Sequence, residues 1–483
     1  MSTVAPEKSC ATATHARRPG EGRDPVPFPR YLEYKDSGVA WLGEVPAHWD
    51  LCSLRRRVAM NPSKSEIATL DRDLEISFLP MEAVGEQGQL DLDRKRPIRE
   101  VENGYTYFHD GDVAFAKITP CFENGKGALM RGLTNGVGFG TTELTVIRSK
   151  PELLYPEFLD WLLRTVEFRG QGEASMYGAG GQKRVPDDFV RDFRAAFPPA
   201  HEQVAIAAFL DRETAKIDAL IAEQERLVAL LKEKRQALIS HAVTKGLDPN
   251  APMKDSGIEW LGQVPAHWDI LPIKRDIAFI TSGSRGWAEH YADDGELFLR
   301  IGNLARETID LDLTDLQRVS VPDGAEGART KVVPGDVLFS ITAYLGSIAI
   351  APAGLEPAYV SQHIALVRFR QHRLLPRWVG YVTLSVIGKT YLEAQAYGGT
   401  KIQLGLDDVA NLPATAPSLE EQTAIIEFLD GAITKFDGLA RQVEVAINLL
   451  KERRAALISA AVTGKIDVRD VAPVEVAHGN STA

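Results

Sequence analysis

The sequence has few cysteines and no long apolar run, and both absences exclude classes of protein. Its 483 residues include three cysteines, Cys10, Cys52 and Cys121, and none belongs to a Cys-x-x-Cys pair. This excludes a disulfide framework and a cysteine-based zinc site. The apolar stretches are interrupted by Gly, Ser and Pro well short of the roughly 18 residues that a membrane helix needs. The polar N-terminal stretch carries no secretory signal core, so we expect a cytoplasmic protein with no membrane partner.

Positive charge and catalytic motifs are also scarce. The 55 Lys and Arg residues are outnumbered by 66 Asp and Glu residues, which gives a formal net charge of −11. This balance argues against a protein that coats nucleic acid by charge alone. A Gly-x-x-x-x-Gly-Lys phosphate loop is missing, because Pro120, Thr383 and Ser459 stand where its first glycine is required. We therefore expect neither an ATP site nor a metal site on this chain.

What the sequence does contain is an internal repeat. Residues 35–50 read KDSGVAWLGEVPAHWD and residues 254–269 read KDSGIEWLGQVPAHWD, with 13 of 16 positions identical at an offset of 219 residues. Residues 202–244 match residues 421–463 at the same offset in 23 of 43 positions, whereas the segments between these blocks have diverged. Such a duplication predicts one scaffold that presents two different binding surfaces. His48 and His267 belong to the repeat, and we expect them to pack or cap locally rather than to bind metal.

The longer repeated block has the period of a long helix. Its residues recur at alternating spacings of 3 and 4, as in the seam of a coiled coil. Pro199 and Pro417 precede the two helices, and Gly246 and Gly464 follow them as stops. Each stripe alone could belong to a core helix, but two matched helices favour an intramolecular antiparallel coiled coil. The expected seam contains Ile217, Leu220, Gln224, Leu227, Leu231, Lys234 and Leu238, and in the second copy Phe436, Leu439, Val443, Ala446, Leu450, Arg453 and Leu457.

The diverged segments read as mixed α and β. Strand-like runs at 112–116, 144–147 and 337–341 are bounded by Gly, Pro and Asp, and helical periodicity appears at 156–166 and 376–386. The expected fold class is α+β, with two mixed α/β domains joined by two long helices that form an antiparallel coiled coil, in an internal pseudo-twofold repeat. The expected segments are a disordered extension at 1–30, a first globular domain at 31–198, a first spacer helix at 199–248, a second globular domain at 249–416, a second spacer helix at 417–467 and a disordered tail at 468–483.

Three elements that recur twice, in the same order, resemble a known family. They are the KDSGxxWLGxVPxHW segment, the Gly-Asp-Val triplets at 111–113 and 335–337, and the Pro-x-x-Glu-Gln sequence at 199–203, which leads into a long helix. Together they are similar to type I restriction-modification specificity subunits. The second copy has one extra residue between Pro417 and its Glu-Gln pair. The resemblance covers about residues 31–467.

The resemblance implies a DNA-reading subunit without catalytic residues of its own. The two globular domains would be target recognition domains, each reading one half of a bipartite, asymmetric site in double-stranded DNA. The helices would dock two methyltransferase subunits, and a motor-nuclease restriction subunit would join the complex. S-adenosylmethionine and ATP would then bind to these partners, and this chain would hold no cofactor. The candidate partner-binding residues on the helices are Leu220, Leu227, Leu231, Leu238, Leu439, Leu450 and Leu457.

Two alternative functions remain open. The chain could be an orphan DNA-binding module of the same fold without an active partner enzyme. It could also be a self-contained DNA methyltransferase, but the Asn/Asp-Pro-Pro-aromatic tetrapeptide of amino-methyltransferases is missing. The sequences Asn-Pro-Ser at 61–63 and Asp-Pro-Asn at 248–250 do not complete it.

Candidate DNA-binding residues lie in basic clusters and in two Gly-rich loops. Phosphate contacts require Lys, Arg and backbone NH groups, while base contacts require side chains that reach the edge of a groove. The loops at 177–184 and 397–401 each combine an aromatic residue, glycines and a cation. For the basic triplets, a solvated charge run is the alternative. The candidates are Arg55, Arg56, Arg57, Arg94, Lys95, Arg96, Lys117, Tyr177, Gln182, Lys183 and Arg184 in the first segment, and Arg285, Tyr344, Ser361, Gln362, His363, Tyr397, Thr400 and Lys401 in the second.

Overall fold

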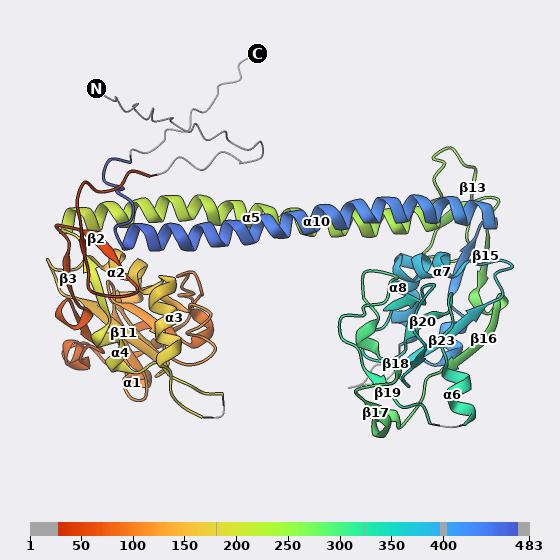
Figure 1. The fold of residues 1–483 in the computed structure, drawn as a ribbon, viewed down its shortest axis with the longest axis horizontal. Helices are drawn as coiled ribbons and strands as arrows, with labels where there is room; N and C mark the ends of the chain where they lie inside the picture. The colour runs from red at the N-terminus through yellow and green to blue at the C-terminus, as the bar shows by residue number, and fades with distance from the viewer. Residues whose placement is uncertain (1–27, 180, 323, 397–402, 472–483) are drawn as a thin grey trace, which may run out of the picture. The chain divides into compact units, whose positions relative to one another are not determined.

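The computed structural model describes residues 28–179, 181–322, 324–396 and 403–471, which belong to two compact units. Unit 1 contains the chain up to Ile221 and again from Asn448 onward, and unit 2 contains Ala222–Ile447. Both boundaries fall inside long helices, α5 (Ala200–Lys245) and α10 (Leu419–Val462), which are drawn in Figure 1. Each unit therefore consists of one globular domain and a stretch of both helices.

The globular domain of unit 1 contains two four-stranded sheets. Its strands are β1 (Tyr34–Asp36), β2 (Glu44–Pro46), β3 (Asp50–Ser53), β4 (Val58–Met60), β5 (Glu75–Leu79), β6 (Lys95–Pro97), β7 (Thr106–His109), β8 (Val113–Ala116), β9 (Gly127–Leu129), β10 (Val137–Gly140), β11 (Leu144–Ser149) and β12 (Arg194–Phe197). Its helices are α1 (Ile98–Val101), α2 (Pro156–Leu163), α3 (Val166–Ser175) and α4 (Asp187–Asp192). The sheet orders are β6-β5-β10-β7, in which β5 and β10 are parallel, and the fully antiparallel β4-β11-β8-β9.

The globular domain of unit 2 has a corresponding pair of sheets. Its strands are β13 (Met253–Asp255), β14 (Gln263–Pro265), β15 (Asp269–Pro272), β16 (Ile277–Ser282), β17 (Tyr291–Ala292), β18 (Glu296–Leu299), β19 (Arg318–Val319), β20 (Val337–Ser340), β21 (Ile348–Ile350), β22 (Ala358–Val360), β23 (Ile364–Phe369) and β24 (Pro413–Ala416). Its helices are α6 (Ala325–Thr330), α7 (Pro376–Leu384), α8 (Val386–Gln395) and α9 (Leu406–Ala410). The orders are β16-β23-β20-β21 and β17-β19-β18-β22, with β18 and β22 parallel. The α+β class and the internal repeat are thus confirmed.

The repeated Gly-Asp-Val triplet has a structural role in both units. Asp112 and Asp336 lie at the start of β8 and β20, and both side chains are fully inaccessible to solvent. Asp112 accepts hydrogen bonds from Nε and Nη2 of Arg148 at 2.6 and 2.8 Å, and Asp336 accepts the same two bonds from Arg368 at 2.7 Å each. Because a buried carboxylate is stable only when it is paired and hydrogen-bonded, this ion pair ties neighbouring strands together.

The Glu of each Pro-x-x-Glu-Gln motif contacts the repeated His-Trp pair. The carboxylate of Glu202 is only 2% exposed and hydrogen-bonds to Nε2 of His48 at 2.7 Å and Nε1 of Trp49 at 3.1 Å. The two repeated blocks of unit 1 are therefore in direct contact, and His48 is held by a residue 154 positions away in the sequence. The same contacts recur in unit 2 between Glu421, Nε2 of His267 at 2.9 Å and Nε1 of Trp268 at 3.0 Å.

The neighbouring Gln fastens the start of each long helix to its globular domain. Nε2 of Gln203 donates to the carbonyl oxygens of Pro198 at 2.8 Å and Leu153 at 3.3 Å, while its Oε1 accepts from the NH of Tyr155 at 2.7 Å. The amide is thus satisfied within the segment that leads into α2. Gln422 makes the equivalent contacts with Pro417, Arg373 and Leu375.

Each diverged segment begins and ends at neighbouring positions. β3 pairs with β12, which places Asp50 opposite Phe197, and β15 pairs with β24, which places Asp269 opposite Ala416. The segments at 51–197 and 270–416 are therefore inserts whose two ends meet in a two-stranded sheet.

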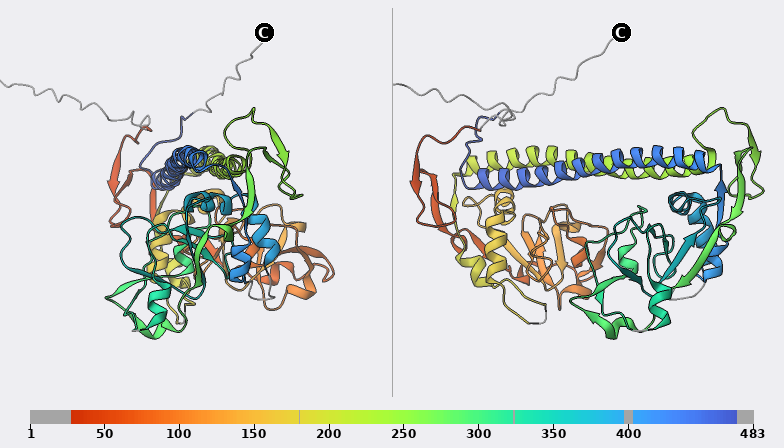
Figure 2. Two further views of the ribbon diagram at one scale, coloured as in Figure 1. Left: turned by 90° about the vertical axis from the view of Figure 1, so that its right-hand side faces the viewer. Right: turned by 45° about the vertical axis from the view of Figure 1, so that its right-hand side comes forward.

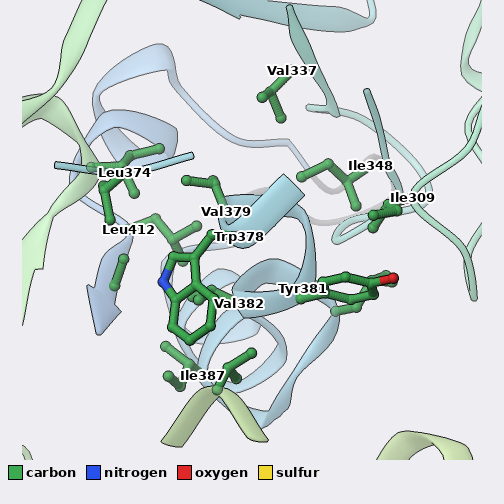
Figure 3. Packing of buried hydrophobic residues seen from close by; sticks show 14 of the residues in the cluster. Ile309, Val337, Ile348, Leu374, Trp378, Val379, Tyr381, Val382, Ile387 and Leu412 are labelled. Carbon is green, nitrogen blue, oxygen red and sulfur yellow. The ribbon is translucent and has the colours of Figure 1, made fainter. Parts of the chain in front are cut away.

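The core of unit 2 is built around α7. Trp378 is completely buried, and its Nε1 donates to the carbonyl oxygen of Thr415 at 2.6 Å. Figure 3 shows it among Val379, Val382 and Leu412. The predicted helices at 156–166 and 376–386 end earlier, at Leu163 and Leu384, and Thr165 and Ser385 are the N-caps of the next helices, α3 and α8.

Within each unit, α5 and α10 lie side by side, as both views of Figure 2 show, and the colours in the right-hand view show that they are antiparallel. In unit 1, Asp218 accepts hydrogen bonds from Nε of Arg454 at 2.8 Å and from its Nη2 at 3.2 Å. In unit 2, Nε of Arg235 lies 3.4 Å from Oδ1 of Asp437. The two ion pairs are equivalent under the repeat, so the helices have the same register in both units.

The seam differs from the predicted one at every second position. Leu220, Leu227 and Leu439 are 46%, 40% and 48% exposed, whereas Ile221 is buried. The expected seam cations, Lys234 and Arg453, are likewise exposed. The sequence has adjacent apolar residues at 220–221 and 227–228, so two stripes one residue apart satisfy the same spacing. The structure selects the stripe that contains Thr214, Ile217, Ile221, Val228 and Arg235, with Arg454 as the equivalent cation in α10.

Glycines end both helices, and unit 1 is closed by segments far apart in the sequence. Gly246 and Gly464 have φ of +77° and +72°, which confirms them as helix stops.

The hydroxyl of Tyr34 donates to the carbonyl oxygen of Gly464 at 3.0 Å, and the NH of Asp467 donates to the carbonyl oxygen of Pro29 at 2.7 Å. Residues 28–30 and 468–471, which the sequence assigned to disordered ends, thus contribute ordered structure. No helix within the described ranges is long and apolar enough to cross a membrane.

Candidate nucleic-acid interface

The Gly-rich loop of unit 1 is a hairpin that presents side chains to solvent. Its ends are joined by reciprocal backbone hydrogen bonds between Tyr177 and Arg184, at 2.9 and 3.2 Å. Thr119, which follows β8, accepts from the NH of Lys183 at 3.0 Å and anchors the loop. Tyr177 is 68% exposed, and Gln182 and Lys183 are also exposed. The loop hangs from the side of the domain opposite α5 (Figure 1).

A hollow lies at the base of this loop, and we call it the loop-base hollow of unit 1. The hollow is partly cationic, because Lys117 forms no ion pair with any described residue. The charge of Arg191 is balanced by the Asp188 carboxylate at 3.2 Å. Nε and Nη2 of Arg184 donate to the two carboxylate oxygens of Glu143 at 2.9 and 2.8 Å, which lowers the pKa of Glu143. The hollow is lined by Lys117, Tyr177, Arg184, Val185, Pro186, Asp187, Asp188 and Arg191.

Unit 2 has its own loop-base hollow, with different side chains. His363 lies at its edge, with Nδ1 3.1 Å from the hydroxyl of Thr342 and Nε2 3.2 Å from the amide nitrogen of Gln362. Arg285, the guanidinium of which forms no ion pair with any residue in the described ranges, also lines the hollow. The complete lining is Ser282, Arg285, Ile341, Thr342, Gln362, His363, Gln403, Leu404, Gly405 and Leu406.

The two hollows occupy equivalent places. A β-bridge joins Ile118 to Arg184 in unit 1, and a matching bridge joins Thr342 to Gln403 in unit 2. Glu143 directly precedes β11 and His363 directly precedes β23, and these two strands have the same register against β8 and β20. Arg184 and Glu143 therefore correspond to Gln403 and His363. The scaffold thus offers one position twice, with an acid-base pair in one unit and different polar groups in the other.

The first basic triplet divides into one structural and two exposed residues. Arg57 has a side chain only 15% exposed, pairs with Asp50, donates to the carbonyl oxygen of Leu153 at 2.8 Å and lies over Phe197. It is therefore unavailable to DNA without loss of these contacts. Arg55 pairs with Asp192 at 2.7 Å on the surface, and Arg56 is exposed.

The second basic triplet lies on and beside an edge strand. Arg94 pairs with Glu82 at 2.8 Å on the surface. Lys95 and Arg96 begin β6, the edge strand of its sheet, and are exposed with no ion pair to any described residue. They remain candidates for phosphate contacts.

The candidates of unit 2 have mixed outcomes. Ser361 is 6% exposed, with its NH bonded to the carbonyl oxygen of Leu299, so this side chain cannot reach a groove and its prediction is wrong. Tyr344 is 47% exposed, and the guanidinium of Arg306 lies 3.7 Å from its ring centre. The sequence analysis missed Arg306, because an isolated arginine outside any motif gives no signal. Tyr397, Thr400 and Lys401 lie outside the described residues.

Comparison with known proteins relates parts of this chain to one family. Residues 314–448 match the family model of the type I restriction modification DNA specificity domain. The chain is 35% identical over 230 residues to the type I restriction enzyme EcoAI specificity subunit of Escherichia coli, and 39% identical over 189 residues to the EcoEI specificity subunit. Over these regions the chain is similar to the specificity subunits of type I restriction-modification systems. These alignments cover 47% and 39% of this chain and 37% and 31% of the relatives, so the match spans about a third of their length.

Two solved structures share the fold of this chain. A chain from a study of complex assembly and conformational transition of the type I R-M system aligns with a TM-score of 0.66 and 21% identity, over 86% of this chain and 98% of its own. The HsdS subunit from Thermoanaerobacter tengcongensis aligns with a TM-score of 0.50 and 20% identity, over 87% and 98%.

The predicted partner-binding leucines fall into two groups. Leu220, Leu227 and Leu439 are exposed and do not take part in the seam. A solvent-exposed leucine is free to contact another protein, so these three remain candidates. The others are half-buried between the helices and their surroundings, namely Leu231, Leu238, Leu450 and Leu457.

Proposed function

We propose that this chain is the non-catalytic DNA-reading subunit of a type I restriction-modification complex, and that the domain of each unit reads one half of a bipartite double-stranded site. The observation that carries the proposal is the repeated loop-base hollow. The hollow of unit 1 lies at the base of a Gly-rich loop, and both hollows are lined by hydrogen-bonding side chains that differ between the copies. One scaffold with two different polar surfaces is what an asymmetric site requires.

The enzymatic steps would belong to partner subunits. Two methyltransferase subunits would dock on the helices and bring S-adenosylmethionine, and a motor-nuclease subunit would bring ATP-driven activity. The exposed leucines on α5 and α10 support such docking, because apolar side chains on a helix surface are a common feature of protein interfaces. A complex of this kind would act in the cytoplasm, where it meets DNA.

The test maps methylated adenines in cells that express this chain with its methyltransferase subunits. The wild-type chain should direct methylation to one bipartite motif. Lys183→Ala, in the loop of unit 1, should change the sequence preference of one half only, because the loop belongs to one domain.

The matched control is Arg72→Ala, which also removes one cation of unit 1. Arg72 pairs with Glu102 and does not line the hollow. This variant should leave the motif unchanged. Equal loss of both halves in Lys183→Ala would contradict the assignment of one half to each domain, and absence of any motif would contradict the function.

A further inference from the structure

We propose that Arg184 reads a guanine in the half-site of unit 1 and that Glu143 is the residue that positions it. The inference rests on the proposed function and extends it from a domain to a single base. It concerns two residues 41 positions apart in the sequence that meet in the loop-base hollow.

The geometry holds the guanidinium in one plane while leaving part of it accessible. Two parallel hydrogen bonds to Glu143 use Nε and one hydrogen of Nη2 of Arg184, so Nη1 and the second hydrogen of Nη2 are left as a donor pair for another partner. The Arg184 side chain is 40% exposed and that of Glu143 is 25% exposed. An arginine fixed in this way loses little rotational freedom when it binds, which favours a specific contact.

The scaffold in turn fixes Glu143. Its carbonyl oxygen accepts from the NH of Lys117 at 2.9 Å, and its NH donates to the hydroxyl of Thr141 at 3.3 Å. Arg184 itself is bonded through its backbone to Tyr177 and bridges to Ile118. Both partners are therefore anchored in regular structure rather than in the tip of the loop.

The chemistry of the pair favours a base over a phosphate. Arginine donating to O6 and N7 of guanine is the commonest specific contact in the major groove. A guanidinium whose charge is balanced by a carboxylate gains little from binding phosphate, which is the contact that carries no sequence information. Lys117, which forms no ion pair with a described residue, is better placed for a phosphate.

The equivalent position of unit 2 indicates which half-site should require a guanine at this contact. There His363 and Gln403 replace the carboxylate and the arginine. Because neither offers a guanidinium held by a carboxylate, the requirement should be confined to the half-site of unit 1.

The experiment measures binding of the full complex with its methyltransferase subunits to the wild-type site and to every single-base change of it. Arg184→Lys keeps the charge but cannot donate in the bidentate manner. It should reduce discrimination at one guanine by about 5- to 150-fold, which corresponds to the 1–3 kcal/mol of a bidentate contact, and leave the other positions unchanged.

Two further variants separate positioning from simple structural damage. Glu143→Gln releases the charge of Arg184, so discrimination at the same guanine should fall while binding to non-specific DNA increases and its salt dependence steepens by about one phosphate contact. Lys117→Ala should weaken binding to all sequences equally and make the salt dependence shallower by a similar amount.

The outcomes distinguish the inference from the function on which it rests. The inference would be overturned, and the function left standing, by a wild-type motif with no guanine in the half-site of unit 1. The same holds for an Arg184→Lys variant that loses discrimination equally at every position. A wild-type complex without sequence-specific binding would overturn both. Thermal unfolding of each variant shows whether the fold is intact, and Glu143→Gln with unchanged salt dependence would reject the positioning role.

Discussion

At the scale of single residues, the repeated motifs are explained by contact between them. His48 and Trp49 lie at the end of one repeated block and Glu202 begins the other, and the buried carboxylate of Glu202 hydrogen-bonds to both. The Glu202 carboxylate therefore depends on the other block for its hydrogen-bond partners. Sequence comparison within the chain could find both blocks, but it could not show that they touch.

This contact predicts a difference between the two units. In the wild-type protein the buried carboxylate of Glu202 accepts hydrogen bonds from three donors, one of which is the hydroxyl of Tyr31. Glu202→Gln replaces one of its acceptor oxygens with an NH2 group. We therefore expect the free energy of unfolding to fall by about 1–3 kcal/mol. Glu421→Gln is the matched control, since that side chain is 32% exposed and water can replace the lost bonds. Chemical denaturation of both variants measures the difference, and an equal loss in the two would refute the role of burial.

The candidate site was predictable only in part at this scale. The Gly-rich loop at 177–184 was recognisable from its composition, and it does present Tyr177, Gln182 and Lys183 to solvent. Glu143 was missed, because a carboxylate 41 residues away becomes a partner of Arg184 only through strand pairing. Ser361 was misplaced for the same reason, since its burial depends on a neighbouring strand.

At the scale of elements, the length and ends of the long helices were predictable, but the seam was not. Helical period and glycine stops place α5 and α10 within a few residues. The choice between Leu220 and Ile221 as a seam residue depends on which stripe the partner helix meets. Tertiary contacts such as the Asp218–Arg454 pair decide between the two, and the spacing of apolar residues does not predict these contacts.

The two equivalent ion pairs between the helices should differ in their coupling free energy. Arg454 donates two hydrogen bonds to Asp218, whereas Nε of Arg235 is 3.4 Å from Asp437 and makes no hydrogen bond. A double-mutant cycle with Asp218→Asn and Arg454→Met should give a coupling of about 1–2 kcal/mol. The cycle with Asp437→Asn and Arg235→Met serves as control and should give a smaller coupling, because Nε of Arg235 makes no hydrogen bond. Equal couplings would mean that hydrogen-bond alignment does not matter here.

At the scale of the whole molecule, the duplication makes the two inserts exchangeable. Each insert enters and leaves through a two-stranded sheet, β3 with β12 or β15 with β24. A chain in which residues 51–197 replace residues 270–416 should therefore fold and direct methylation to a motif whose two halves have the same sequence. Mapping modified adenines tests this. A variant that folds but keeps the original asymmetric motif would show that the inserts do not carry the specificity.

The closure of unit 1 by Tyr34 and Gly464 has a consequence for biosynthesis. Unit 2 is one continuous stretch, Ala222–Ile447, whereas unit 1 also needs residues from Asn448 onward, including the buried Ile458 and Val462. As the chain emerges from the ribosome, the domain that starts first is thus the last to be finished. Nascent chains interrupted before Asn448 would retain a complete unit 2 beside an unfinished unit 1, so both halves become competent only when translation has passed through α10.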